Sequence, residues 1–108
     1  MALAFAERTL NLHDMEAKAA EAATLLNAMA NPTRLLILCA LVNGERPVHE
    51  LVAQSGISQS AVSQHLTKMR NLKLVSTRRD AQSIYYTLAS DEVRRVLEVL
   101  YDVYCRVD

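Results

Sequence analysis

The chain has little of what flexible or membrane-spanning proteins use. Only two glycines and two prolines occur among 108 residues, while apolar residues make up 51% of the sequence. This composition excludes extensive disorder and predicts a compact, mostly helical protein. The longest uninterrupted apolar run, Leu35 to Val42, is too short to cross a bilayer as a helix.

The N-terminal stretch Met-Ala-Leu-Ala-Phe-Ala-Glu-Arg has no basic segment ahead of its short apolar part. A secretory signal peptide needs such a segment. We therefore expect a cytoplasmic protein with no membrane partner. In that reducing compartment, a disulfide between the two cysteines would be a reversible switch and not a permanent structural link.

The sequence also lacks the arrangements that support catalysis or tight metal binding. It contains no glycine-rich phosphate loop and no nucleophile elbow, and its histidines, His13, His49 and His65, are scattered. Soft or borderline metals need thiolate or imidazole donors that converge on one point. These absences argue against an enzyme, a cofactor and a metal site.

Acidic residues are absent from one long segment, although the formal charge of the whole chain is zero. Between Ser58 and Arg79 every charged residue is basic: Lys68, Arg70, Lys73, Arg78 and Arg79. The rest of the chain therefore carries a formal charge of −5. Positive charge gathered on one part of a small domain is typical of a nucleic-acid-binding surface.

Capping residues predict two helices at the start of the chain. Small and apolar residues at helical spacing indicate the first helix over residues 14–29. Asn31 as the N-cap and Pro32 at the first helical position predict a second helix, which ends before Gly44. Because this helix is apolar nearly all round from Leu35 to Leu41, we expect it in the centre of the domain.

The next segment has the pattern of a helix-turn-helix over residues 48–72. Gly56 separates its two helices at a turn that needs a positive φ, and Ser58 is the N-cap of the second helix. We expect the apolar residues of both helices to pack together in one seam: Leu51, Val52, Ile57, Val62, Leu66 and Met69.

A β-hairpin and a last helix complete the pattern. Residues 74–88 are rich in β-branched and aromatic residues, which predicts a wing of two strands with its tip at residues 80–82. Ser90 is the expected N-cap of a helix over residues 90–105. The order of elements predicts a mainly α fold with a small β-hairpin, the winged helix-turn-helix, as a single domain over residues 1–108.

The outward face of the second helix of this motif carries short polar and amide side chains, which suit hydrogen bonds to base edges in the major groove. The expected DNA contacts from this helix are Ser58, Gln59, Ser60, Ser63, Gln64, His65, Thr67 and Lys68. Arg78 and Arg79, beside the hairpin tip, are expected to reach the DNA backbone or the minor groove. Each residue alone fits a solvated surface equally well, and His65 also fits a local structural hydrogen bond. The set favours DNA binding because it coincides with the acid-free segment.

Several stretches resemble one known family. They are Asn-Pro-Thr-Arg-Leu-Leu-Ile-Leu from Asn31, Ser-Gln-Ser-Ala-Val-Ser-Gln-His-Leu from Ser58, Leu74-Val75 and Tyr85-Tyr86. Over residues 16–106 the sequence resembles the arsenic-repressor (ArsR) family of winged-helix regulators. The resemblance implies a homodimer built on the first and last helices, residues 14–29 and 90–105. It also implies a palindromic operator in double-stranded DNA and an inducer that weakens operator binding.

The metal-sensing patterns of that family are missing. Its thiolate sensors carry Cys-Val-Cys where this chain has Pro47-Val48-His49, and its other metal sensors carry histidines on the last helix, which has none here. The pair Cys39 and Cys105 instead resembles the reactive-sulfur branch of the family. That resemblance implies that persulfides or oxidants link Cys39 to Cys105, by a disulfide or polysulfide bridge, and so lower operator affinity. The regulated genes in this branch serve sulfide detoxification or virulence.

The residues themselves leave the role of the cysteines open. Burial in an apolar helix is expected to raise the pKa of Cys39, so we expect Cys105 to react first and Cys39 to resolve the product. In the alternative, Cys39 is a small core residue and Cys105 an incidental one, and the protein binds DNA constitutively. An atypical metal-responsive regulator is a further alternative. The sequence does not reveal which operator is bound. It also does not decide between repression and activation, of which we expect repression.

Overall fold

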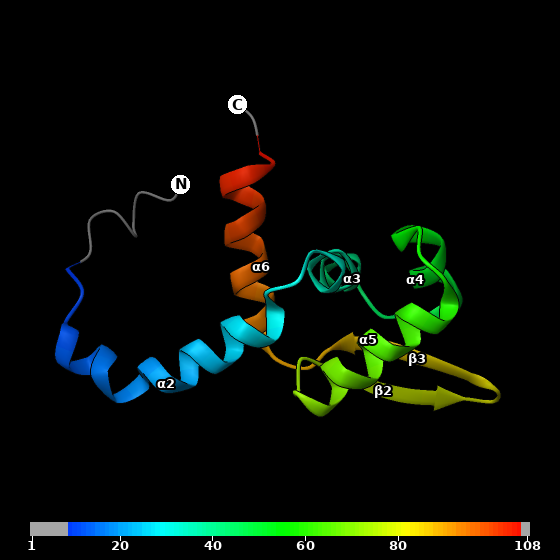
Figure 1. Cartoon of the computed structure of the whole chain (residues 1–108), viewed down its shortest axis with the longest axis horizontal. Coiled ribbons are helices and arrows are strands. Elements are labelled where there is room, and N and C mark those ends of the chain that lie inside the picture. Colours follow the sequence, from blue (N-terminus) through cyan, green and yellow to red (C-terminus); the bar gives the residue numbers. More distant parts are fainter. Residues whose placement is uncertain (1–8, 107–108) are drawn as a thin grey trace.

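The computed structural model describes residues 9–106, so the N-terminal stretch used for the signal-peptide argument lies outside the described residues. The elements follow in the order α2 (Leu12–Met29), α3 (Pro32–Val42), β1 (Arg46–Pro47), α4 (Val48–Ser55), α5 (Gln59–Asn71), β2 (Val75–Asp80), β3 (Ser83–Leu88) and α6 (Asp91–Tyr104). This mostly helical arrangement with a small antiparallel sheet confirms the predicted winged helix-turn-helix (Figure 1).

Two helices extend away from the body that holds the helix-turn-helix and the wing. In Figure 1, α2 runs to one side and α6 rises away from it, while α4, α5 and the hairpin gather at the other end. The radius of gyration is 15.7 Å, against about 13 Å for a compact domain of this size. Within residues 9–106 no single helix is long and apolar enough to span a membrane; α2 and α3 together pass that test by length and composition only, and they meet at 96°.

Local hydrogen bonds confirm the expected helix starts. The side chains of Asn31, Ser58 and Ser90 each accept a hydrogen bond from the backbone N–H three residues later, at 3.1, 3.1 and 3.3 Å. The first helix begins two residues earlier than expected, because Asn11 caps it by accepting from the backbone N–H of His13 at 2.8 Å.

Four of the described residues have a positive φ, Gly44 at +137° among them, and the other three shape the helix-turn-helix and the wing. Gly56 has φ +73°, as expected, and ends α4. Lys73 has φ +65° and closes α5 through hydrogen bonds from its own N–H and that of Leu74 back to the last turn of the helix. Ala81, at φ +57°, makes the wing tip shorter than predicted, since the strands pair up to the Asp80–Ser83 register and leave two residues in the loop.

A third strand was not predicted. Residues Arg46 and Pro47 form β1, which pairs antiparallel with Tyr86 and Tyr85 of β3, so the strand order is β1-β3-β2. A two-residue strand is too short to leave a periodic signal in a sequence. Its effect is to tie the wing to the segment that precedes the helix-turn-helix.

The core confirms the predicted seam. Leu51, Val62, Leu66 and Met69 are at most 1% exposed, and Val52 and Ile57 pack against them as half-buried residues. The second helix is central as expected, with Leu38 and Leu41 fully buried. It is not covered all round, however.

One side of α3 reaches the surface. Leu36 is 61% exposed and Cys39, three residues later on the same side, is also exposed. The helix is apolar nearly all round, yet this face is left uncovered by the other elements among residues 9–106.

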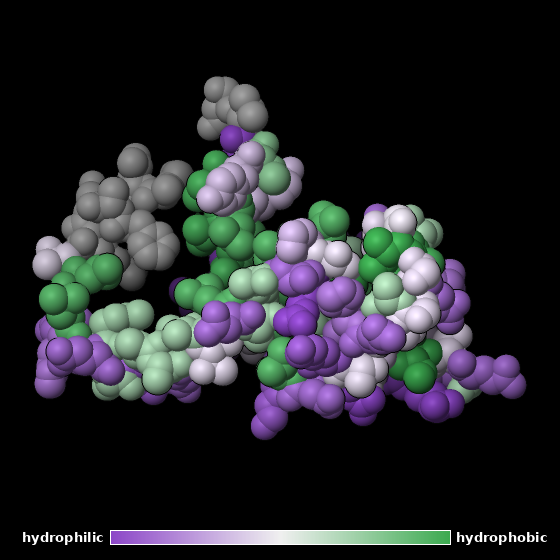
Figure 2. Space-filling view, in the orientation of Figure 1, coloured by the Kyte–Doolittle hydropathy of each residue, from purple (hydrophilic) through white to green (hydrophobic). Residues whose placement is uncertain are grey.

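Apolar side chains are concentrated on the two extended helices. The exposed ones on or just before them are Leu10, Leu12, Met15, Leu26, Val99, Tyr101, Val103 and Tyr104. Figure 2 shows hydrophobic residues along α6 and at the N-terminal end of α2. Clustered apolar surface of this kind marks a contact with another macromolecule.

Candidate DNA-binding surface and cysteine pair

Helix α5 lies on the surface of the body and presents one continuous polar face. Its exposed residues include Ser58 at the N-cap and Gln59, Ser60, Gln64, Thr67 and Lys68 along the helix. Ser63 is half-buried and lines a shallow groove with Gln64, Thr67, Lys68 and Asn71. The helical period places these positions on one side. The structure thus brings seven of the eight helix residues predicted for DNA binding onto one surface.

His65 is the exception. It is half-buried and lies outside the face formed by Gln64 and Lys68. This position suits the structural alternative better than a base contact. No acidic residue occurs on α5, and Lys68 and Arg70 lie in its last turn.

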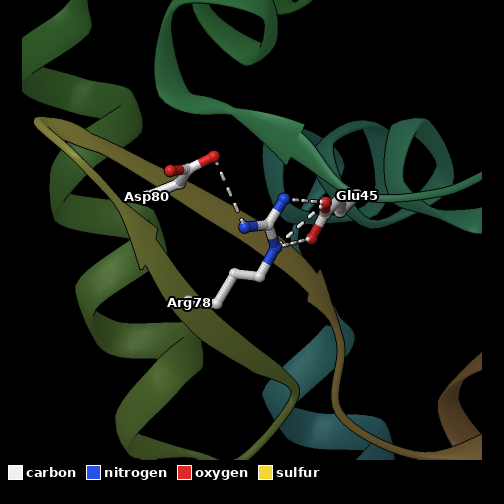
Figure 3. Close-up of polar contacts among 3 residues, drawn as sticks. All are labelled: Glu45, Arg78 and Asp80. Carbon is white, nitrogen blue, oxygen red and sulfur yellow. Dashed lines mark hydrogen bonds and ion pairs between the residues drawn. The ribbon is translucent and has the colours of Figure 1, made fainter.

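The two wing arginines have different surroundings. Arg78 donates from Nε to Oε2 of Glu45 at 2.8 Å and from Nη2 to Oε1 of the same carboxylate (Figure 3). It also lies 3.9 Å from Asp80 and 4.7 Å from the centre of the Tyr85 ring. Arg79 is exposed and makes no ion pair within the described part of the chain.

The pair between Arg78 and Glu45 changes the electrostatics of the wing. The hydrogen bond from Arg78 is the main cause that lowers the pKa of Glu45, and the same bond raises the pKa of Arg78. Because Glu45 lies outside the acid-free segment, the sequence count overstated the positive charge that the wing presents. The antiparallel pairing of β1 with β3 brings Glu45 here, and no local pattern announces it.

Other arginines hold helix ends. Arg34 donates to the carbonyl of Ala28 at 2.9 Å, at the end of α2, and Arg94 donates to the carbonyl of Val42 at 2.6 Å, at the end of α3. The last carbonyls of a helix have no partner within the helix, so these guanidinium groups satisfy them. Arg94 thereby fixes α6 against α3, the two helices that carry the cysteines.

Both cysteines are free and exposed. Cys39 lies on α3 and Cys105 is the C-cap of α6. Partial desolvation raises the pKa of Cys39, and the negative charge of a Cys105 thiolate raises it further. The expected direction is confirmed, but Cys39 is not the enclosed core residue of the alternative interpretation. The two cysteines belong to helices that pack against each other, Cys39 on α3 and Cys105 at the end of α6.

A cavity of about 580 Å³ lies beside this pair. Its lining combines one thiol with apolar, aromatic and charged side chains: Cys39, Val42, Asn43, Leu97, Glu98, Tyr101, Asp102 and Arg106. Cys105 directly precedes Arg106 in the chain, and Arg106 pairs with Asp102 at 3.0 Å. Small solutes therefore have access to the region between the helices.

No group of three or more His, Cys, Asp or Glu residues in the described range 9–106 is arranged to hold a metal ion. His13 is exposed on α2, and His49 is exposed on α4.

Comparisons with known proteins agree with this fold. Residues 31–77 match the family model described as "Bacterial regulatory protein, arsR family". The chain is 48% identical over 99 residues to the transcriptional activator HlyU of Vibrio cholerae serotype O1, covering 92% of each protein. The crystal structure of the transcriptional repressor BigR from Xylella fastidiosa superposes with a TM-score of 0.85 at 38% identity, covering 91% of this chain and all of that one.

A homodimeric winged helix-turn-helix DNA-binding domain from Mycobacterium bovis is also similar, with a TM-score of 0.71 at 29% identity over 91% of this chain and 88% of that one. The family and its relatives regulate transcription and are not enzymes. This chain belongs to the arsR family of bacterial transcriptional regulators.

Proposed function

We propose that this protein is a homodimeric repressor that binds a palindromic operator and releases it when Cys39 and Cys105 become linked. The inducer is a reactive sulfur species or an oxidant, and the regulated genes serve sulfide detoxification or virulence. The observation that carries the proposal is that both cysteines are free and exposed on two helices that pack together, with Cys39 lining an open cavity between α3 and α6.

The polar face of α5 supports the DNA-binding part. Its Gln and Ser side chains provide donors and acceptors for base edges, and Lys68 and Arg79 provide charge for phosphates. A dimer reads a palindrome when its two recognition helices enter major grooves about 34 Å apart. The spacing of the two helices is therefore the quantity that an inducer has to change.

The exposed apolar residues of α2 and α6 support the dimer. A lone protomer would leave Leu26, Val99 and Val103 in water, at 54%, 46% and 66% exposure. A second copy of the chain that covers them gains the free energy of apolar burial. The homodimeric relative from Mycobacterium bovis has the same fold.

The chemistry needs no oxidant other than the persulfide. The Cys105 thiolate attacks the outer sulfur of a persulfide R–S–SH, the S–S bond breaks and RS⁻ leaves, which yields Cys105–S–SH. The Cys39 thiolate then attacks the Cys105 sulfur and expels HS⁻, which forms the disulfide. The raised pKa of Cys39 supports this order, because less of Cys39 is thiolate at neutral pH. A direct disulfide requires Cα atoms within about 7 Å, and a longer separation favours a polysulfide.

The link acts through the two helices that it joins. Helix α3 packs on the helix-turn-helix, whereas α6 carries part of the exposed apolar surface. A covalent bridge between them fixes their relative position, so it shifts the DNA-reading helices against the dimer contact. A coupling free energy of about 1–3 kcal/mol lowers operator affinity by roughly 5- to 150-fold.

The test uses an operator selected by the reduced protein from a random DNA library. Wild type, Cys39→Ser and Cys105→Ser are treated with glutathione persulfide, and free thiols, intact mass and operator affinity are measured for each. We expect wild type to lose both thiols within one chain and to lose affinity, while both variants bind DNA before and after treatment. Operator affinity that stays the same after treatment in all three proteins would support a constitutive regulator with inert cysteines. Release of DNA by added metal, abolished by a chelator, would support the metal-responsive alternative.

A further inference from the structure

We infer that the cavity between α3 and α6 selects sulfur donors that carry an ammonium group over donors of net negative charge. The inference rests on the proposed sensing function and assigns its inducer to a chemical class: the persulfide of a small amino thiol, such as cysteine. It follows from the charges that line the cavity and from the place of the thiols beside them.

The lining carries more negative than positive charge. Three charged residues at four-residue intervals along and just after α6 line the cavity: Glu98, Asp102 and Arg106. Arg106 is engaged with Asp102 at 3.0 Å. Glu98 has no ion-pair partner in the part of the chain that the structure describes. Arg94, one turn earlier on α6, is held at the carbonyl of Val42, so the lining residues themselves carry one unpaired negative charge.

The rest of the lining suits a short aliphatic donor. Val42 and Leu97 provide apolar surface, and Cys39 lies among them. A donor whose ammonium group lies at Glu98 has its sulfur inside the cavity that Cys39 lines and that Arg106, the neighbour of Cys105 in the chain, also lines. The same position would place a carboxylate-rich donor against an unpaired carboxylate.

The cavity stays open in the proposed dimer. With 3.6 residues per turn, Glu98, Tyr101 and Asp102 lie on one side of α6, while Val99 and Val103 lie on a different side. A partner that covers the apolar side therefore leaves the cavity accessible to solutes.

The charge of Glu98 affects only how the donor approaches, and the reaction of the thiols with the persulfide is the one given under the proposed function. The Cys105 thiolate takes the outer sulfur of the persulfide and the amino thiolate RS⁻ leaves. One ion pair between the donor's ammonium group and Glu98, in partly solvated surroundings, changes the rate of thiol loss by about 3- to 10-fold. Glutathione persulfide, with two carboxylates against one ammonium, is expected to react more slowly than cysteine persulfide for this reason.

The experiment compares cysteine persulfide with N-acetylcysteine persulfide, in which acetylation removes the charge of the amine. Rates of thiol loss are measured for the folded dimer and for the same protein unfolded in urea, where only the intrinsic reactivity of each donor matters. For each state of the protein we divide the rate with cysteine persulfide by the rate with N-acetylcysteine persulfide. We expect this ratio to be about 3- to 10-fold larger for the folded protein than for the unfolded protein. Glu98→Gln should bring the folded-state ratio back toward the unfolded-state ratio. Glu92→Gln, which removes an acid outside the cavity lining, should not.

Each outcome decides between the two ideas. A folded-state ratio equal to the unfolded-state ratio, or a preference that survives Glu98→Gln, overturns the donor selection while leaving the switch intact. If no donor links the two thiols of the folded protein, the proposed sensing function fails, and the donor selection fails with it.

Discussion

Arg78 of β2 is held by Glu45, a residue 33 positions earlier, through two hydrogen-bonded nitrogens. The contact clamps the wing to the segment before β1 and occupies a guanidinium group that the sequence pattern assigns to DNA. A carboxylate that binds Arg78 uses the same donors as a DNA phosphate does. In the wing, therefore, Glu45 and a DNA phosphate would compete for Arg78, whereas Arg79 makes no ion pair among the described residues.

The first prediction concerns this competition. Glu45→Gln removes the charge that holds Arg78, so we expect operator affinity to rise several-fold at low salt. The slope of log affinity against log salt should steepen by about 0.9 if Arg78 gains one phosphate contact. Glu50→Gln is the matched control, because Glu50 pairs with Arg46 and not with the wing. Unchanged affinity and slope in Glu45→Gln would show that Arg78 contacts no DNA phosphate even when Glu45 no longer holds it.

The second prediction separates two roles of α5, recognition of base edges and attraction to phosphates. Gln64→Ala should relax sequence preference at one base pair by about 1–3 kcal/mol. Lys68→Ala should instead weaken binding to all sequences and reduce the salt slope by about 0.9. His65→Gln, which lies off this face, should change neither property. Competition binding against a library of single-base operator variants at two salt concentrations measures all three.

The third prediction concerns the dimer. Val103, 66% exposed on α6, is expected to lie in the contact between two copies, so Val103→Glu should yield monomers with greatly reduced operator affinity. Leu72→Gln changes an apolar residue that is 40% exposed at the C-cap of α5 and should leave the dimer intact. Sedimentation equilibrium decides the point, and a dimeric Val103→Glu protein would place the contact elsewhere.

The fourth prediction follows from the pKa of Cys39. Its thiol has a pKa above the ordinary value of 9.0, with desolvation as the larger cause and Cys105 as the smaller. Iodoacetamide reacts with the thiolate, so the rate of Cys39 alkylation should still be rising with pH at 9.0 and should level off only at higher pH. Cys105→Ser removes the smaller cause and should shift the profile part of the way down. A profile that returns to the ordinary value in this variant would mean that charge, and not desolvation, dominates.

The last prediction tests the turn of the helix-turn-helix. Gly56 has φ +73°, and a Cβ at this position would meet no atom within 4 Å, so backbone strain is the whole cost of Gly56→Ala. We expect the free energy of unfolding to fall by about 1–2 kcal/mol in urea titrations. Lys73→Gly, the opposite change at another left-handed position, should not lower it. A neutral Gly56→Ala would show that the turn adapts.

Short-range interactions account for most of what the sequence predicted correctly. The caps at Asn31, Ser58 and Ser90 and the turn at Gly56 depend on contacts within a few residues, so their residue types are sufficient signals. The apolar seam follows from helical spacing alone. The acid-free stretch likewise places the polar surface of α5 without knowledge of the rest of the fold.

Contacts between distant residues account for what the sequence did not reveal. The β1 strand and the pair between Glu45 and Arg78 arise because β1 lies beside β3, and neither has a local signature. The exposure of Cys39 depends on which side of α3 the other elements leave uncovered. Composition and spacing thus determined the winged helix-turn-helix and the polar face of α5, since both depend on nearby residues. Only the tertiary structure decided which charges are paired and that a cavity opens beside Cys39, because both depend on how α3, α6 and the sheet pack.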